Sequence, residues 1–430
     1  MISRFFECLV PISSCNLYCE YCYVIQGNRR NIKIPGISYS VSQFRKAISL
    51  DRLGGVCFFS FCGSGETLLC EELPELVQVA LETGHIVNIT NNGTITQKID
   101  HFLNLPIQYQ KNLLFSFSLH YTELKKRNLL GVFAKNVKNV MKSDISCFVS
   151  LNLCDDYIEN INQIKEYCLD NFGVLPQVAL TRIEGDGYSI FSKLTPEEYK
   201  SYGDTFQSPL FEYTYNNFKV KREEYCHAGE VSYCLNLATG DLKRCYAETP
   251  FMNFFDESIT EIPRLPIGKY CKSKYCVNSS HFLSLGAIPD FDNTSYAFLR
   301  QRENGWIKNN VLVELSQKLK CRTKDTCELF LASGGDNIVI YGAGRAAREV
   351  LCLLRKRNIV PKQFVVKHCS DNPCEIEGIK VFGLEEAARS IKKMSVIIAI
   401  KNYSVINEVQ HELETRGIYH IFNYYDVLAT

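Results

Sequence analysis

The chain has 430 residues, enough for two or three domains at roughly 150 residues each. Its apolar fraction of 46% is ordinary for a globular protein with hydrophobic cores. Because the formal net charge is only +1 at pH 7, the charge balance favours neither a nucleic acid nor an anionic membrane as a partner, and we expect neither.

Targeting signals are also missing from the sequence. No apolar run reaches the roughly 18 residues that a membrane helix needs. Residues 1–10 carry Arg4 and Glu7 inside a short apolar part, unlike a secretory signal. We therefore expect a cytoplasmic protein. In a reducing compartment, its 20 cysteines are better read as metal ligands and buried thiols than as disulfides.

The first region, residues 1–205, alternates short apolar strands with longer helical stretches. Strands are expected at Phe6–Pro11, Val56–Cys62, Val87–Thr90, Leu114–Leu119, Cys147–Leu153 and Gln177–Arg182. Helices are expected at Val41–Leu50, Leu73–Thr83 and Ile158–Asn171. This alternation predicts an α/β fold with a parallel sheet covered by helices. Six strand–helix units fit a partial (β/α)6 barrel better than a closed eight-stranded one.

Two further regions follow. Residues 206–330 are irregular, with cysteines beside glycines and turn residues, as in a small domain organised by a metal. After a linker at 333–335, residues 335–430 predict a small Rossmann-like α/β domain. Its elements are expected at Asn337–Tyr341 (strand), Ala346–Arg357 (helix), Gln363–Lys367 (strand), Val396–Ile400 (strand) and Ser404–Arg416 (helix).

The strongest chemical signal is the set Cys15, Cys19 and Cys22. Three thiolates at spacings of four and three can hold one [4Fe–4S] cluster from a single loop. Three ligands leave one iron open for a substrate or cofactor. The alternatives are a three-cysteine zinc site, although structural zinc prefers a fourth protein ligand, and plain buried thiols.

This loop resembles the CxxxCxxC motif of the radical S-adenosylmethionine (SAM) superfamily, and the resemblance covers about residues 5–300. It implies that the open iron binds the amino and carboxylate groups of SAM. It implies that reduction of the cluster cleaves SAM to methionine and a 5′-deoxyadenosyl radical, with a flavodoxin or ferredoxin as electron donor. Tyr21 matches the position that lies near the adenine.

Other stretches resemble SAM contacts of the same family. Residues 63–66 resemble its glycine–glycine–glutamate loop, with Ser64 in place of the first paired glycine. Asn92 lies in a stretch that resembles its TNG turn, and Arg182 could pair with the SAM carboxylate. The implied cofactor-binding residues are Tyr21, Gly63, Ser64, Gly65, Glu66, Asn92, Ser116, Ser118 and Arg182.

Two residues are candidates for catalysis. Ser116, Ser118 and His120 alternate on the fourth strand, so we expect them to share the face that points into the barrel. Cys62, if it faces the barrel, is a candidate hydrogen donor. The alternatives are ordinary polar residues at strand ends and plain packing of the Cys62 thiol.

A second group of cysteines comprises Cys226, Cys245, Cys271 and Cys276, enough to ligate one [4Fe–4S] cluster fully. A hairpin at 238–241 would bring Cys226 and Cys245 together. The pattern resembles the SPASM/Twitch extensions of radical SAM enzymes. It lacks the later run of cysteines that completes a two-cluster domain, so one auxiliary cluster is expected. A four-cysteine zinc site is the alternative, and Cys234 is an alternative ligand.

The last region contains Gly342, Gly344 and Ala347, which fit a G-x-G-x-x-A turn after a strand. A phosphate could bind at the N-terminus of the following helix. Lys367 and His368 stand where an acidic ribose ligand is expected. Nucleotide or nucleotide-sugar binding, and a docking or dimerisation role, both stay open.

The sequence therefore predicts a radical SAM enzyme that removes hydrogen from an unactivated carbon of a peptide or protein, giving epimerisation, dehydrogenation or a crosslink. A carbohydrate or nucleotide-linked small molecule is the alternative substrate. It is favoured by the Rossmann-like region and by the expected lack of an N-terminal leader-binding domain. A non-catalytic iron–sulfur or zinc scaffold is the alternative of another class.

Overall fold

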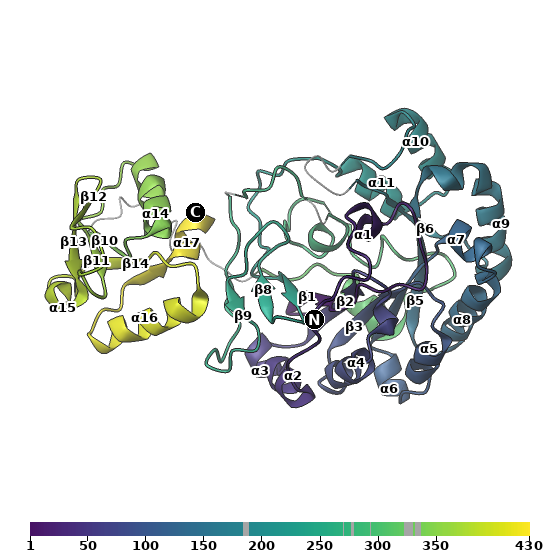
Figure 1. The fold of residues 1–430 in the computed structure, drawn as a ribbon, viewed down its shortest axis with the longest axis horizontal. Coiled ribbons are helices and arrows are strands. Elements are labelled where there is room, and N and C mark those ends of the chain that lie inside the picture. The colour runs from purple at the N-terminus through teal and green to yellow at the C-terminus, as the bar shows by residue number, and fades with distance from the viewer. Residues whose placement is uncertain (184–188, 270, 277–278, 293, 322–329, 332–336) are drawn as a thin grey trace.

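The computed structural model describes residues 1–430 except 184–188, 270, 277–278, 293, 322–329 and 332–336 (Figure 1). The linker expected at 333–335 lies outside the described residues. Within the described part of the chain, no helix has the length and apolar character required to cross a membrane.

Six parallel strands form the centre of the larger sheet, and they lie side by side in chain order. They are β1 (Arg4–Val10), β2 (Cys57–Gly63), β3 (Ile86–Asn91), β4 (Leu113–Ser118), β5 (Ser146–Leu153) and β6 (Gln177–Leu180). The predicted fold class, an α/β protein with a partial six-stranded barrel, is confirmed.

Helices cover one face of this sheet (Figure 1). The longer ones are α2 (Val41–Ala47), α4 (Leu73–Glu82), α5 (Thr96–Leu103), α8 (Leu130–Lys142) and α9 (Ile161–Phe172). Phe115 and Phe117 of β4 point toward them: the Phe115 ring lies 5.7 Å from Phe102 of α5, and the Phe117 ring lies 6.1 Å from Phe133 of α8. Such aromatic pairs each contribute about 0.5–1.5 kcal/mol beyond the area they bury.

The opposite face of the same strands is polar. Because side chains alternate along a strand, Ser60, Asn88 and Ser116 point away from the helices. The Asn88 Nδ2 group donates to Ser60 Oγ at 2.9 Å, and the Ser116 hydroxyl donates to Asn88 Oδ1 at 2.6 Å. Glu7 of β1 shares this face, since it stands beside Ser60 in the register. The concave side of the partial barrel therefore carries a hydrogen-bonded polar row.

Three more strands extend the sheet past β1. They are β7 (Ser232–Asn236), which pairs parallel with β1, followed by the antiparallel β8 (Asp241–Lys243) and β9 (Met252–Asn253). The hairpin expected at 238–241 is thus present, and it belongs to the barrel sheet. After it come η3 (Ser279–Leu283) and α12 (Asn309–Leu315). The domain boundary at 205/206 stays a prediction.

Two predicted helices are divided in the structure. The helix expected at Val41–Leu50 ends at Ala47, because Ser49 leaves the helical conformation and starts a new short helix. The helix expected at Ile158–Asn171 is a 3-10 turn up to Asn160 and α-helical only from Ile161. The remaining elements of this part are α1 (Tyr23–Gln26), α3 (Leu50–Leu53), η1 (Thr67–Leu69), α6 (Ile107–Gln110), α7 (Tyr121–Lys126), η2 (Asp155–Asn160), α10 (Pro196–Asp204) and α11 (Pro209–Asn216).

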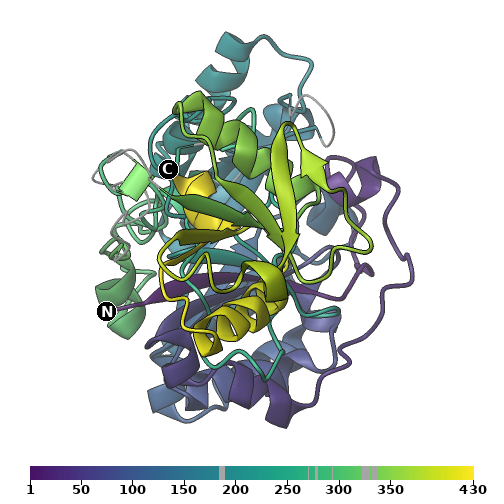
Figure 2. The same ribbon diagram turned by 90° about the vertical axis from the view of Figure 1, so that its left-hand side faces the viewer.

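The C-terminal unit has its own six-stranded sheet, in the order β12-β13-β11-β10-β14-β15 (Figure 2). All its pairs are parallel except β12 with β13. The chain runs outward from β10 and then returns to its other side with β14, so the order reverses between these two strands. Its elements are β10 (Ile338–Tyr341), α14 (Arg345–Lys356), β11 (Gln363–Val366), β12 (Glu375–Ile376), β13 (Ile379–Gly383), α15 (Leu384–Ala387), β14 (Ser395–Ile398), α16 (Tyr403–Thr415), β15 (Ile421–Asn423) and α17 (Tyr424–Ala429).

This unit packs against the segment that follows the hairpin. The Tyr403 N–H donates to the Phe251 carbonyl at 2.8 Å, and the Ser404 hydroxyl donates to Asp256 Oδ2 at 2.7 Å. A Cβ atom on Gly268 would lie 2.2 Å from the carbonyl oxygen of Ala429, so α17 touches backbone directly there. The C-terminal unit is thus docked beside the second group of cysteines.

Candidate functional site

The first three cysteines lie in the loop that follows β1. Cys19 is buried, whereas Cys15 and Cys22 are half-buried. The loop turns back on itself, because the Cys22 N–H donates to the Cys19 carbonyl at 2.9 Å. Burial, followed by the nearby thiols of Cys15 and Cys22, raises the pKa of Cys19 to about 12. Burial therefore disfavours the thiolate forms of Cys15 and Cys19, and a bound cation would favour them.

The spacing of these three sulfurs can be compared with the ligand spacing around a single metal ion. Among the described residues, one trio has its ligand atoms all within 4.8 Å of one another, and that trio is His227, Glu230 and Cys321. Zinc–sulfur bonds of about 2.3 Å would place ligand sulfurs only about 3.8 Å apart. In a cubane each thiolate binds a different iron, so the ligand sulfurs lie farther apart than they do around one zinc ion. The three thiols are therefore farther apart than the ligands of one zinc ion, and the [4Fe–4S] cluster stays a prediction.

The glycine loop after β2 is pressed against the cysteine loop. The Gly65 N–H donates to the Ile12 carbonyl and the Glu66 N–H donates to the Ser14 carbonyl, both at 2.8 Å. A Cβ atom on Gly65 would lie 1.9 Å from the Ser14 oxygen, and one on Gly63 would lie 2.4 Å from Ile12 Cγ2. Glycine is required at both positions by this close approach. Ser64, between them, is half-buried.

Glu66 and Asn92 join the neighbouring loops together. The buried Glu66 carboxylate accepts the N–H groups of Asn92, at 2.8 Å, and of Leu68, at 3.1 Å. Burial raises the pKa of Glu66 to about 7, although these two bonds oppose the shift. The Asn92 Nδ2 group donates to Asn16 Oδ1 at 2.7 Å, next to Cys15. The Asn92 side chain therefore holds the cysteine loop directly, and Glu66 holds the backbone of Asn92.

Tyr21 and His120 meet above the sheet. The Tyr21 hydroxyl is hydrogen-bonded to His120 Nδ1 at 2.6 Å and to the Tyr157 hydroxyl at 2.8 Å. Burial lowers the pKa of His120 to about 4, so its ring is neutral near pH 7. The expectation that His120 continues the alternation of β4 was wrong. The strand ends at Ser118, and His120 (φ −90°, ψ 65°) is the residue that precedes α7.

The other expected SAM contacts are spread along the strand ends. Ser116 is buried and bonded to Asn88, and Ser118 is half-buried at the end of β4. Arg182 lies two residues beyond β6 and is exposed, and its carbonyl accepts the Gln26 side-chain amide at 3.3 Å. Their contacts with SAM stay predictions.

A carboxylate that the sequence analysis did not select lies at the centre of the polar face. Glu7 accepts the Cys62 thiol at 3.8 Å, and its other oxygen is 3.2 Å from His281 Nδ1. Burial and the Glu7 charge raise the pKa values of both Cys62 and Cys234, so the two side chains stay neutral thiols. Cys62 therefore lies on the same face as Glu7, toward the barrel interior, and its role as hydrogen donor stays a prediction. The sequence feature that could have identified Glu7 is its position as a charged residue inside an apolar strand.

The second group of cysteines is also brought together. Burial, followed by the nearby thiols of Cys276 and Cys271, raises the pKa of Cys245 to about 12. The pKa of Cys226 is raised by burial and then by the thiols of Cys245, Cys276 and Cys271. Backbone bonds at 3.1 and 2.9 Å join Cys226 to Gly268, the residue that packs against Ala429 of the C-terminal unit. The structure thus brings these four thiols near one another, with no described trio of them within 4.8 Å, and the auxiliary cluster stays a prediction.

Comparison with known proteins gave structural matches only. No protein-family model and no curated protein matches the sequence. Streptococcus suis SuiB bound to S-adenosylmethionine is 16% identical at a TM-score of 0.44, over 60% of this chain and 64% of SuiB, so the match spans less than two thirds of SuiB. Native anSMEcpe with bound AdoMet is 15% identical at a TM-score of 0.43, over 60% of this chain and 80% of that protein. BtrN in complex with AdoMet and 2-DOIA is 14% identical at a TM-score of 0.34, over 61% and 82%.

Proposed function

We propose that the protein is a radical SAM enzyme. The observation that carries the proposal is the three-cysteine loop at the carboxyl end of β1, locked by two 2.8 Å backbone bonds to the glycine loop at the carboxyl end of β2. Parallel α/β sheets bind their ligands at this edge. Three thiolate ligands on a four-iron cluster would leave one iron for a cofactor.

Each of these residues has a proposed role. Cys15, Cys19 and Cys22 hold the cluster, and the side-chain-free backbone of Gly63 and Gly65 lets the SAM-binding loop approach it. The cluster and SAM together supply a 5′-deoxyadenosyl radical, which abstracts hydrogen from an unactivated carbon. The protein excludes water and fixes the distance between the two loops through the buried Glu66 and Asn92.

A peptide or protein is the proposed substrate, bound over the polar face near Glu7. Cys62 supports epimerisation among the possible outcomes, because a thiol must keep its proton to donate a hydrogen atom, and Glu7 favours the protonated form. A carbohydrate or nucleotide-linked molecule is the second candidate, favoured by the C-terminal sheet with its order reversal between β10 and β14.

The second group, Cys226, Cys245, Cys271 and Cys276, is proposed to hold an auxiliary [4Fe–4S] cluster that exchanges electrons with the substrate site. Reduction of the first cluster requires an outside one-electron donor of the flavodoxin or ferredoxin type. Arg182 and Tyr21 remain the proposed partners for the SAM carboxylate and adenine.

The test is an anaerobic preparation assayed for iron, sulfide and 5′-deoxyadenosine. About eight irons per chain are expected, four for each cluster. Cys19→Ala should abolish 5′-deoxyadenosine formation and halve the iron. Cys147→Ala, which alters a buried core thiol on β5, serves as the matched control. One or two zincs and no SAM cleavage would instead support the scaffold alternative, and full turnover by Cys19→Ala would refute the cluster assignment.

A further inference from the structure

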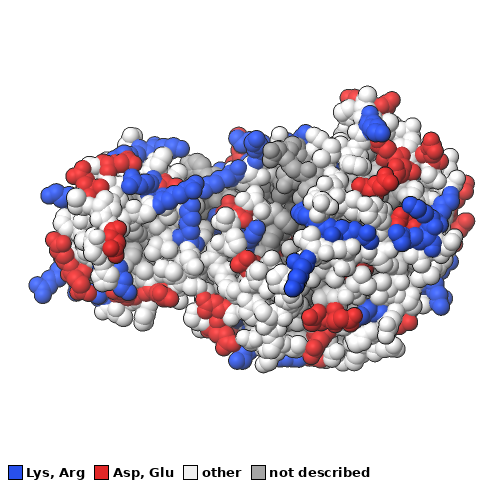
Figure 3. Space-filling model, viewed as in Figure 1, with Lys and Arg blue, Asp and Glu red and all other residues white. Residues whose placement is uncertain are grey.

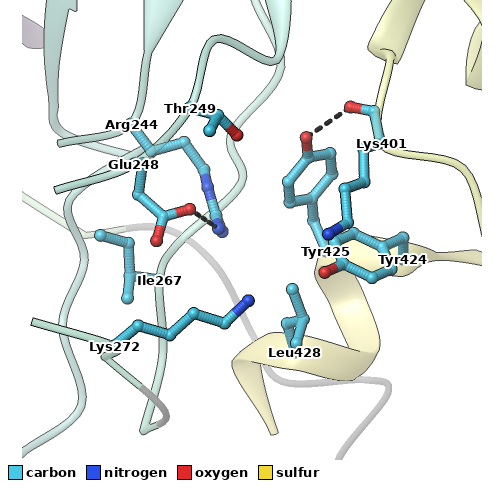
Figure 4. A pocket seen from close by; sticks show the side chains of 9 residues that line it. All are labelled: Arg244, Glu248, Thr249, Ile267, Lys272, Lys401, Tyr424, Tyr425 and Leu428. Carbon is cyan, nitrogen blue, oxygen red and sulfur yellow. Dashed lines mark hydrogen bonds and ion pairs between the residues drawn. The ribbon is translucent and has the colours of Figure 1, made fainter. Parts of the chain in front are cut away.

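A cavity of about 40 Å³ lies between the C-terminal unit and the segment that carries the second group of cysteines (Figure 4). A single enclosed water needs roughly 10–15 Å³, so the cavity has room for a small polyatomic group. Figure 4 shows Arg244 and Lys272 on one side of the space, with Lys401 and Tyr425 facing them from the other. Both parts of the molecule therefore build its wall.

The lining of this cavity is positive. It contains three cations, Arg244, Lys272 and Lys401, and one carboxylate, Glu248. Glu349, which is not part of the lining, pairs with Lys401 at 3.1 Å and with Lys272 at 4.0 Å, so these five groups carry a net charge of +1. The charged ends of the three cations point into the space (Figure 4). On the face shown in Figure 3, Lys and Arg side chains also extend along the C-terminal unit toward this junction. The field at the cavity therefore favours an anion.

Arg244 is a fixed part of the wall. Its side chain is only 3% exposed, and its guanidinium lies 4.5 Å from the centre of the Tyr425 ring. It donates to the Pro266 carbonyl at 2.9 Å and to Glu248 at 2.6 Å. A guanidinium held in this way loses little conformational freedom when it binds an oxyanion.

The cavity also lies where an α/β sheet binds ligands. Lys401 follows β14 and Tyr424 follows β15, so both come from the carboxyl ends of parallel strands. Glu349 of α14, the helix after β10, pairs with Lys401 at 3.1 Å and accepts a bond from the Tyr424 hydroxyl. These contacts span the point between β10 and β14 at which the strand order reverses, the usual ligand position in such sheets.

We propose that this cavity binds the phosphate group of a small phosphorylated ligand, between Arg244 and Lys401, with Lys272 at its mouth. Arg244 precedes Cys245 and Lys272 follows Cys271, so a bound phosphate joins the C-terminal unit to the loops of the second group of cysteines. Free phosphate and the phosphate of a nucleotide share this chemistry. The site does not depend on the proposed SAM chemistry.

The test is calorimetric titration of the anaerobic full-length protein with inorganic phosphate and, separately, with ADP. Lys401→Met should weaken phosphate binding about tenfold or more, since it removes one charge-assisted hydrogen bond. Lys272→Met, at a side chain that is 63% exposed, should also weaken binding and leaves the fold intact. Lys362→Met is the matched control, because this exposed lysine precedes β11 and so lies at the amino ends of the parallel strands, away from the cavity at their carboxyl ends.

The outcomes are separable. Similar affinity for phosphate and ADP identifies phosphate alone as the recognised group, whereas tighter ADP binding identifies a nucleotide. The proposal is overturned if neither ligand binds, or if both Lys401→Met and Lys272→Met bind as well as Lys362→Met. The titration needs neither SAM nor turnover, so its failure leaves the proposed enzyme activity untouched.

Discussion

Replacing Gly65 with alanine should separate the two loops that meet at the candidate site. The new Cβ atom would lie 1.9 Å from the Ser14 carbonyl oxygen, and ordinary contact begins near 3.4 Å, so one loop must move by about 1.5 Å. That shift breaks the Gly65–Ile12 and Glu66–Ser14 backbone bonds. Two lost bonds at about 0.5–1.5 kcal/mol each, plus about 1–3 kcal/mol of overpacking, give a loss of about 2–6 kcal/mol.

The assay is anaerobic urea unfolding followed by the fluorescence of Trp306, the single tryptophan, whose carbonyl accepts the Cys147 N–H at the start of β5. Iron content per chain is measured in parallel, because Ser14 directly precedes Cys15. Gly131→Ala is the control: this exposed glycine of α8 has no atom within 4 Å of a new Cβ, and alanine there should stabilise by about 0.5–1 kcal/mol. If Gly65→Ala has the same free energy of unfolding and the same iron content as Gly131→Ala, the two loops do not pack as closely as described.

Three further predictions use the same structure. Burial raises the pKa of Glu66 from 4.5 to about 7 in the folded state. The folded state therefore binds this proton more tightly, and the free energy of unfolding should decrease as the pH rises from 4.5 to 7. Glu66→Gln should flatten that pH dependence in urea titrations at pH 5 and 7.5, and an unchanged dependence would contradict the raised pKa of Glu66. Gly268→Ala should loosen α17 and speed carboxypeptidase digestion of the C-terminus, whereas Gly378→Ala, also at positive φ but with open space around it, should not. Ser116→Ala leaves Asn88 Oδ1 without its donor and should cost about 1–3 kcal/mol by urea unfolding; a loss below 0.5 kcal/mol would mean that water replaces the hydroxyl.

Local patterns in the sequence were enough for most elements. The strand expected at Cys147–Leu153 spans Ser146–Leu153, and the helix expected at Ala346–Arg357 spans Arg345–Lys356. Apolar runs and helical periodicity are properties of neighbouring residues, so they can be read without knowing the fold. The cysteine and glycine loops were found for the same reason, since each is a short motif.

Features that depend on distant pairing were missed. The parallel pairing of β7 with β1 places Cys234 beside Glu7 and brings His281 to the same carboxylate. No local pattern encodes that neighbourhood, because Glu7 lies more than 200 residues before both Cys234 and His281. His120 was misplaced for a related reason: alternation predicts a shared face only while the strand continues, and β4 stops at Ser118.

The position of β1 has a consequence for how the chain is made. This strand precedes β7 by more than 200 residues in the chain, yet it lies inside the sheet, between β2 and β7. At a synthesis rate of roughly 5–20 residues per second, the edge of β1 that pairs with β7 stays unpaired for on the order of ten seconds or more, until Ser232–Asn236 has been synthesised. Throughout that time the unpaired edge of Arg4–Val10 can pair with other strands, and only the later pairing with β7 removes this risk.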